Sequence, residues 1–157
     1  MGERKLLCIA DETPESRCAV VFGAARAKRN KSKLVILRII EPLDKSLLGS
    51  IGEAILDEVR TEAESDLQRL SGLAKDTSDI IAETLIFEGR AEDAIKAHME
   101  RDEGIKTLLL AAGTSRAGPG PLVSAALRGS MGFGQRPIAV LIVPGNLDDA
   151  QLIELAS

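Results

Sequence analysis

Two stretches of the sequence carry residues that could bind a small polar ligand, and each directly follows a short apolar run. The first reads Ala10-Asp11-Glu12-Thr13-Pro14-Glu15-Ser16. The Asp11 carboxylate could accept hydrogen bonds from a ribose or an adenine. It could equally bond the backbone N–H groups of its own turn, as aspartates after a strand often do. Both interpretations stay open from the sequence alone.

The second stretch, Ala112-Gly113-Thr114-Ser115-Arg116-Ala117-Gly118-Pro119-Gly120-Pro121, is rich in glycine and proline. Glycines let the backbone approach a ligand closely, and their N–H groups can hold an oxyanion. Arg116 adds a cation, and Pro121 suits the first position of a helix whose amino end favours negative charge. A plain surface connection is the alternative. The sequence contains no GxxxxGK[ST] P-loop and no GxGxxG after the first apolar run, which argues against a dinucleotide site.

Few residues could support catalysis. His98 is the only histidine, and it is predicted to lie on the surface of a helix away from both stretches. A serine–histidine mechanism therefore has almost no candidates, and the sequence favours a protein that is not an enzyme. A weak ATPase, with Asp11 or Glu12 holding Mg²⁺, is the remaining catalytic alternative. Cys8 and Cys18 show no metal-type spacing and are predicted to be buried thiols in a reducing compartment.

The elements that must position these residues can be read from the hydrophobic pattern. Five short apolar runs, at Leu6–Ala10, Leu34–Ile40, Ile80–Phe87, Thr107–Ala112 and Ile138–Val143, predict strands. Four of them are continuous, as in a parallel sheet that is buried on both faces. Helical patterns separate them at about 14–29, 52–75, 91–101 and from residue 121, with a short last helix capped by Asp148. Thr13 is predicted to cap the first helix, with Pro14 at its first position.

This alternation predicts an α/β fold, an open, doubly wound five-stranded parallel sheet with helices on both faces, and we take its spatial order to be 3-2-1-4-5. The whole chain, residues 1–157, is expected to form one domain, with a short helix or tail at 147–157. In such a sheet the ligand binds where the winding reverses, between the first and fourth strands. The loops that begin at Asp11 and Gly113 would then form the two sides of one crevice.

Composition narrows the choice of partners. The chain carries a formal net charge of −4, and it contains three Phe but no Trp or Tyr. We see no basic block and no aromatic stacking platform, so nucleic acid is not an expected partner. No apolar run approaches the roughly 20 residues that span a bilayer, and no signal peptide is visible. The expected location is therefore the cytoplasm, without a membrane partner.

Five segments in order resemble the universal stress protein family from end to end. Asp11–Ser16 is similar to its Asp-Gly-Ser-x-x-Ser turn, and Leu37–Pro42 to its Leu-His-Val-Val-x-Pro, with Arg38 in place of the usual His. The other three matching segments are Gly89–Ile95, Gly113-Thr114 and Pro137–Val143. The resemblance implies a homodimer paired through the last strand and, in one branch of the family, binding of ATP or another adenine nucleotide, with Mg²⁺ if the ligand is a triphosphate.

Carried over, the resemblance places Asp11 on the adenosine, the Ile39 backbone on the base, and Gly113 and Thr114 on ribose and phosphate. Thr13 is a further candidate residue for binding the nucleotide. The phosphate loop departs from the family pattern, because Arg116 stands where a glycine is usual. The candidates for the rest of that loop are Arg116, Gly118, Gly120, Gly129 and Ser130.

Two registers of the phosphate loop remain open. In one, Gly129-Ser130 form the closing Gly-Ser. In the other, a helix starts at Pro121 and Gly118-Pro119-Gly120 form a shortened loop; helix-start chemistry favours this second register. Pro119 and Pro121 have no N–H groups, so the adenosine half of a site is better supported than the triphosphate half. The leading function is a stress-response regulator that binds an adenine nucleotide, and the alternative is a protein-interaction module without a nucleotide.

Overall fold

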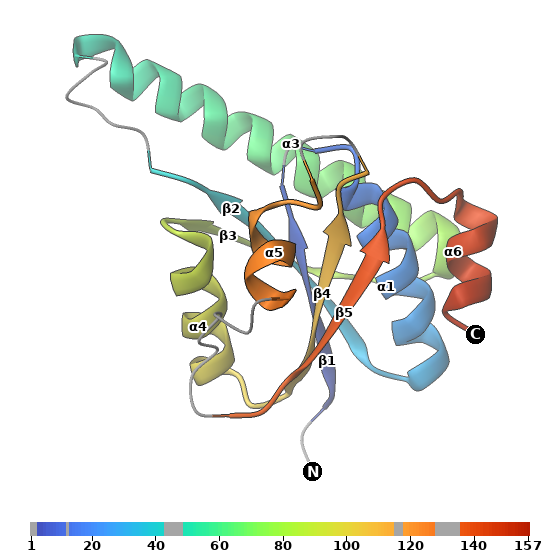
Figure 1. Ribbon diagram of the computed structural model, residues 1–157. Helices are drawn as coiled ribbons and strands as arrows, with labels where there is room; N and C mark the ends of the chain where they lie inside the picture. The colour runs from blue at the N-terminus through green and yellow to red at the C-terminus, as the bar shows by residue number, and fades with distance from the viewer. Residues whose placement is uncertain (1–2, 12, 43–48, 115–117, 128–135) are drawn as a thin grey trace.

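The computed structural model describes residues 3–11, 13–42, 49–114, 118–127 and 136–157, in which five parallel strands form one sheet (Figure 1). The strands are β1 (Lys5–Ala10), β2 (Lys33–Ile40), β3 (Glu83–Glu88), β4 (Ile105–Ala112) and β5 (Ala139–Pro144). Their order is β3-β2-β1-β4-β5, which confirms the predicted fold class. The central strands β1 and β2 are almost fully buried, whereas β3 and β5 form half-exposed edges.

Helices cover both faces of the sheet. They are α1 (Ser16–Asn30), α3 (Gly52–Ser78), α4 (Ala91–Arg101), α5 (Pro121–Leu127) and α6 (Asp149–Leu155), with a short 3-10 turn η1 (Gly49–Ile51) before α3. Figure 1 shows α1, α3 and α6 on one face and α4 and α5 on the other. The first half of α3 extends beyond the sheet. No helix in the described ranges is both long and apolar enough to cross a bilayer.

Each face of the sheet has its own apolar core. The core beneath α1 is the larger, and it is built from small and aliphatic residues because the chain has no Trp or Tyr. Gly23 allows α1 to lie close to the sheet, since a Cβ there would come within 2.9 Å of Leu109 and 3.0 Å of Leu34. The predicted apolar stripe of α1, including Cys18 and Phe22, is buried. The second core lies under α4 and α5 and includes Ile95, Met99 and Val123.

The start of the first helix differs from the prediction. α1 begins at Ser16, and its N-cap residue is Glu15, which makes no side-chain cap bond. Thr13 does not cap the helix, because both its N–H and its hydroxyl donate to the Asp11 carboxylate. Pro14 therefore lies in the turn before α1, where the Arg17 N–H donates to its carbonyl at 3.3 Å. Thr13, which the helix-start pattern assigned to the cap of α1, belongs instead to the Asp11 turn.

The third strand also starts later than the apolar run predicts. α3 continues past Lys75 to Ser78, and Asp79 ends it in the left-handed conformation, with φ 55°. Residues 80–82 then connect α3 to β3, and Ile81 is 84% exposed. An apolar run marks neither the end of a helix nor the start of a strand, so the pattern assigned these residues to the wrong element.

His98 was predicted to lie on the surface, and this was wrong, because the side chain is 7% exposed. Its Nδ1 donates to the Ala94 carbonyl at 2.7 Å. Its ring meets the edge-strand residue Phe87 in a T-shaped contact, with centroids 6.0 Å apart. His98 therefore belongs to the packing between α4 and β3, as a histidine whose polar atom is satisfied by its own helix.

Candidate functional site

The Asp11 turn closes the carboxyl end of β1. Asp11 Oδ1 accepts from the Thr13 N–H at 2.8 Å and from the Ser16 hydroxyl at 3.0 Å, and the Thr13 hydroxyl also donates to it. The Asp11 N–H in turn donates to Ser16 Oγ at 2.9 Å. The turn interpretation of Asp11 is therefore correct for Oδ1. Every hydrogen bond described for this carboxylate goes to Oδ1, which leaves Oδ2 as its acceptor for a ligand.

The glycine-rich loop after β4 folds back on itself. The Gly113 N–H donates to the Pro119 carbonyl at 2.9 Å, and a Cβ at residue 113 would lie 2.9 Å from the Gly118 carbonyl oxygen. Gly118 and Gly120 have φ values of 97° and 108°, which favour glycine. α5 begins at Pro121, and the Ser124 N–H donates to the Gly120 carbonyl at 3.0 Å. The helix start thus agrees with the second register, in which Gly118-Pro119-Gly120 form the loop.

These two loops form the opposite walls of one cleft of about 330 Å³. β1 and β4 are adjacent parallel strands, so the loops after them leave the sheet at the same edge and diverge. Its apolar lining includes Ile9, Leu110, Leu122 and Val123. The volume lies in the range of small-molecule sites, which combine apolar walls with a few polar groups.

The described walls of the cleft carry negative charge. Glu15 lines it together with Asp11, and none of the described lining residues is Lys or Arg. The Glu15 side chain packs against Gly145, where an added Cβ would collide with it and with the Ala112 carbonyl. The cleft therefore suits an uncharged ring system with hydroxyl donors better than a bare phosphate chain.

The structure brings together only part of the site predicted from sequence. Asp11, Thr13, Gly113, Gly118 and Gly120 line the cleft. Ile39 and Thr114 are not among its lining residues; Ile39 is buried at the end of β2, and Thr114 is exposed. Arg116, Gly129 and Ser130 lie outside the described residues, as does Glu12. The contacts of these residues with a ligand stay predictions.

Sequence analysis missed several lining residues: Ile9, Glu15, Ser16, Leu110, Ala111, Leu122 and Val123. Ile9 and Leu110 had been assigned only to the core of the strands. Glu15 and Ser16 belong to the turn after β1, in which a ligand contact was predicted only for Asp11 and Thr13. The signal that could have found them is position, because residues at a strand end or a helix start beside the switch point face the crevice.

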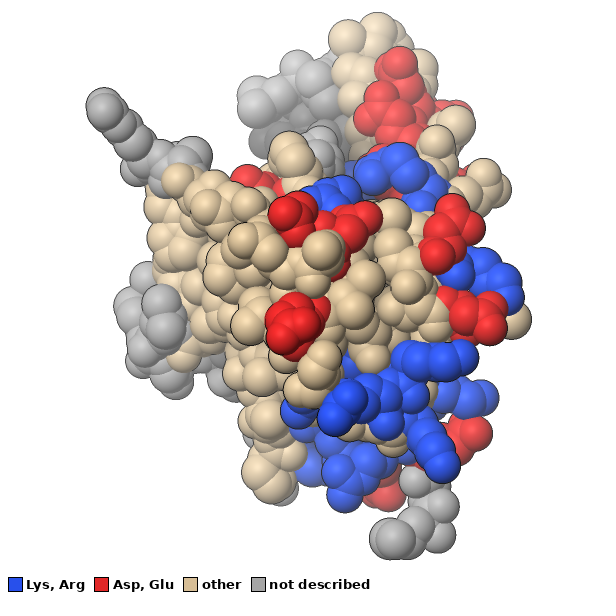
Figure 2. Space-filling model, turned by 90° about the vertical axis from the view of Figure 1, so that its right-hand side faces the viewer, with Lys and Arg blue, Asp and Glu red and all other residues tan. Residues whose placement is uncertain are grey.

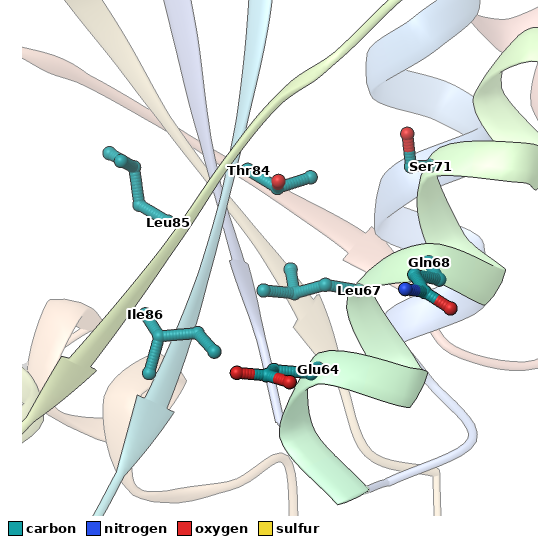
Figure 3. Close-up of a pocket in the computed structure, with 7 residues that line it drawn as sticks. All are labelled: Glu64, Leu67, Gln68, Ser71, Thr84, Leu85 and Ile86. Atoms are coloured by element: carbon teal, nitrogen blue, oxygen red, sulfur yellow. The ribbon is translucent and has the colours of Figure 1, made fainter. Parts of the chain in front are cut away.

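A larger but more open hollow of about 570 Å³ lies elsewhere, between α3 and the edge strand β3. Figure 3 shows Leu67 pointing from α3 toward the sheet, with Thr84 and Ile86 on the same side of β3 and Leu85 on the other. Glu64 and Gln68 form its polar rim. We favour the smaller cleft as the functional site, since loops from two strands converge there, whereas the α3–β3 hollow is a groove left beside an uncovered sheet edge.

The family model for the universal stress protein family matches residues 3–123, from before β1 to the start of α5. The chain belongs to the universal stress protein family. The match includes the Asp11 turn and the glycine-rich loop, and it ends before β5 and α6. No curated protein matches the chain significantly.

Solved universal stress protein structures share the fold across nearly the whole chain. The UspA protein from Lactobacillus plantarum is 17% identical, with a TM-score of 0.74 over 91% of this chain and 99% of that one. A family member from Burkholderia pseudomallei is 14% identical, with a TM-score of 0.64 over 87% and 94%. A universal stress protein in complex with cAMP is 17% identical, with a TM-score of 0.63 over 93% and 100%. At these identities the likeness establishes the fold alone.

Proposed function

We propose that this universal stress protein is a stress-response regulator that binds an adenine nucleotide in the cleft between the Asp11 turn and the glycine-rich loop. One observation carries the proposal: the two loops that the family uses for recognition form the walls of a single cleft of about 330 Å³ at the strand switch point. A structural relative in complex with cAMP supports the same ligand class.

The donors and charges of the cleft favour the adenosine half of the ligand. An adenine ring is planar and uncharged, and it suits the apolar walls that Leu110 and Val123 provide. Asp11 Oδ2 can accept from ribose hydroxyls. The phosphate groups of the nucleotide would meet fewer hydrogen-bond donors. Pro119 and Pro121 lack N–H groups, and the Gly113 N–H already donates to the Pro119 carbonyl.

A triphosphate would bring its own negative charge next to Asp11 and Glu15. Mg²⁺ bound to the phosphates, with carboxylate oxygens as ligands, would offset that repulsion, and these two side chains supply the acidic oxygens that Mg²⁺ prefers. We therefore expect the affinity for AMP to be at least equal to that for ATP when Mg²⁺ is absent.

Isothermal titration calorimetry of the purified protein with AMP, ADP and ATP tests this proposal. We expect measurable binding of AMP, and at least tenfold weaker binding after Asp11→Asn, which keeps the Oδ1 acceptor of the turn while removing the charge. The exposed Glu92 at the start of α4 offers a matched control, Glu92→Gln. Absence of heat with all three nucleotides at millimolar concentration would contradict the proposal.

The second candidate function is a protein-interaction module without a nucleotide. Hydrogen bonds within the glycine-rich loop favour it. The Gly113 N–H and the Gly120 carbonyl already have hydrogen-bond partners in the loop and at the start of α5. Absence of nucleotide binding in the calorimetry, from a protein that is folded and has a normal circular dichroism spectrum, would favour this alternative.

We also propose that the protein forms a homodimer through β5. β5 is an edge strand, so one side of its backbone has no strand neighbour in the sheet, and its Ile142 is 37% exposed. Sedimentation equilibrium tests this, with Ile142→Lys as the disrupting variant. A monomer at all concentrations would contradict it.

A further inference from the structure

The fold gathers basic residues at the amino edge of the sheet, the end opposite the nucleotide cleft. β1, β2 and β4 start at this edge, and α1 ends there, which brings Arg4, Lys33 and Lys106 next to the last turn of α1. Figure 2 shows Lys and Arg clustered at the lower end of the molecule, which is the end where the N-terminus lies in Figure 1. The linear sequence had not indicated a basic patch.

Five of these cations have no partner within the described chain. We call them the basic edge: Arg4, Arg26, Arg29, Lys31 and Lys106. Three nearby lysines, in contrast, form ion pairs. Lys5 bonds Asp102 at 2.7 Å, Lys33 lies 3.1 Å from Glu3, and Lys28 lies 3.9 Å from Asp79. The basic edge thus holds uncompensated positive charge on a chain whose formal net charge is −4. Charge segregated in this way attracts an anionic partner to one end of the molecule.

Two residues of the basic edge line a polar hollow of about 440 Å³ that is suited to an anion. Arg4 and Lys106 line it, together with Asn30, Ser32 and the paired Lys5. The Ser32 hydroxyl is buried and has no hydrogen-bond partner in the described structure. A buried hydroxyl without a partner is costly, and rotation of the Ser32 side chain toward the hollow would let a phosphate oxygen accept its hydrogen bond. Two independent features, free cations and an orphaned hydroxyl, therefore point to the same ligand chemistry.

An exposed aliphatic side chain lies beside two Lys and Arg residues at this end of the molecule. Lys28 and Arg29 line a neighbouring hollow with Ile153, which is 40% exposed, and Ile81 follows the end of α3 at 84% exposure. Aliphatic groups next to Lys and Arg gain free energy at the boundary between lipid headgroups and acyl chains. They gain nothing against the polar backbone of a nucleic acid, and a chain without Trp or Tyr offers little for stacking on bases.

We propose that the basic edge docks this protein onto a bilayer surface that contains anionic phospholipids, with a headgroup phosphate in the hollow between Arg4, Ser32 and Lys106. The docking is peripheral: Lys and Arg attract the anionic surface, and Ile81 and Ile153 enter only the headgroup region. The acidic residues of the first half of α3 lie toward the other end of the molecule (Figure 1). Salt screens repulsion over such distances, since the Debye length is about 8 Å at physiological ionic strength.

Co-sedimentation of the whole protein with vesicles tests the proposal. We expect binding to phosphatidylglycerol–phosphatidylcholine vesicles at low ionic strength, no binding to pure phosphatidylcholine, and release by high salt. The double variant Arg4→Gln, Lys106→Gln is expected to bind roughly 30-fold more weakly, because each cation near an anionic surface adds a comparable increment. Ser32→Ala is expected to weaken binding by about fivefold, through one lost hydrogen bond.

A matched control removes the same charge elsewhere. Arg90 precedes α4 and Lys96 lies in its middle; both are exposed and have no described ion pair. Arg90→Gln, Lys96→Gln should leave vesicle binding unchanged. Equal losses in the two double variants, or absence of binding to the anionic vesicles, would overturn the proposal. So would a preference for duplex DNA or for free inorganic phosphate over the vesicles in competition, since the partner would then be a nucleic acid or a soluble anion.

Discussion

Single residues in this protein show how burial decides the role of a charge. Arg38, the residue that departs from the Leu-His-Val-Val-x-Pro pattern that this segment resembles, is 6% exposed near the carboxyl end of β2. Its Nη1 donates to the Ile39 carbonyl at 2.8 Å, while Nε is buried without a hydrogen bond, 3.6 Å from Asp66 of α3. The sequence showed the replacement but not the burial, because burial of Arg38 depends on where α3 lies.

We expect removal of Asp66 to cost more stability than removal of Arg38. Asp66→Asn should lower the free energy of unfolding by about 1–3 kcal/mol, because it leaves a buried guanidinium without its counter-charge. Arg38→Met should change it by less than about 1 kcal/mol, since it removes the charge and the unsatisfied Nε together. Urea denaturation measures both. A larger loss in Arg38→Met than in Asp66→Asn would contradict this account.

The Lys5–Asp102 pair should make stability depend on pH. The hydrogen bond from Lys5 lowers the pKa of Asp102 below its ordinary value of 3.8, with support from the Gly104 N–H, while partial burial opposes the shift. Because the folded-state pKa is the lower one, the stabilisation is present above about pH 4 and is lost as the pH falls through that folded value.

Asp102→Asn tests this pH dependence. The variant should be less stable than the parent at pH 7, and the difference should vanish in acid, below the folded pKa of Asp102. Glu103→Gln changes a neighbouring exposed carboxylate and serves as the control. The same destabilisation of Asp102→Asn at all pH values would show that the pair acts through geometry and not through charge.

Among the elements, those with local signals at both ends were the most predictable. α4 has the predicted bounds, and α6 starts after the predicted cap Asp148. The predicted starts of α1 and β3 were wrong, because a contact within the preceding turn occupies Thr13 and because an apolar run does not mark where a strand begins. Thr13 donates to the Asp11 carboxylate instead of capping α1, and residues 80–82, which the apolar run assigned to a strand, connect the end of α3 to β3.

Asp148 should contribute measurably to α6. Its side chain accepts from the Gln151 N–H at 2.8 Å, and the Gln151 side chain accepts from the Asp148 N–H at 3.0 Å, which completes a capping box. Asp148→Ala should lower the free energy of unfolding by about 1 kcal/mol, whereas Asp148→Asn should be nearly neutral, because asparagine is an equally good cap. Thermal denaturation compares the two variants. Equal losses would rule out the capping role.

At the scale of the whole molecule, the sheet order was predictable and the composition of the cleft was only partly so. The alternation of strands and helices predicted a doubly wound parallel sheet, and the assumed order 3-2-1-4-5 then placed the loops after β1 and β4 side by side. It was not enough to reveal that Glu15 joins Asp11 in the cleft, where Glu15 packs against Gly145, a residue that follows β5 and is 130 positions away in the sequence. The sequence also could not show the basic edge, since its residues come from the starts of separate strands and the end of a helix.

An NMR titration of the isotope-labelled protein with AMP tests the central claim most directly. If the two loops form one adenosine-binding cleft, backbone amide signals from Ile9 to Ser16 and from Leu110 to Val123 will shift together with a single saturation curve. Signals from the α3–β3 hollow, including Leu67 and Ile86, will stay in place. Shifts confined to that hollow, or to only one of the two loops, would contradict the account.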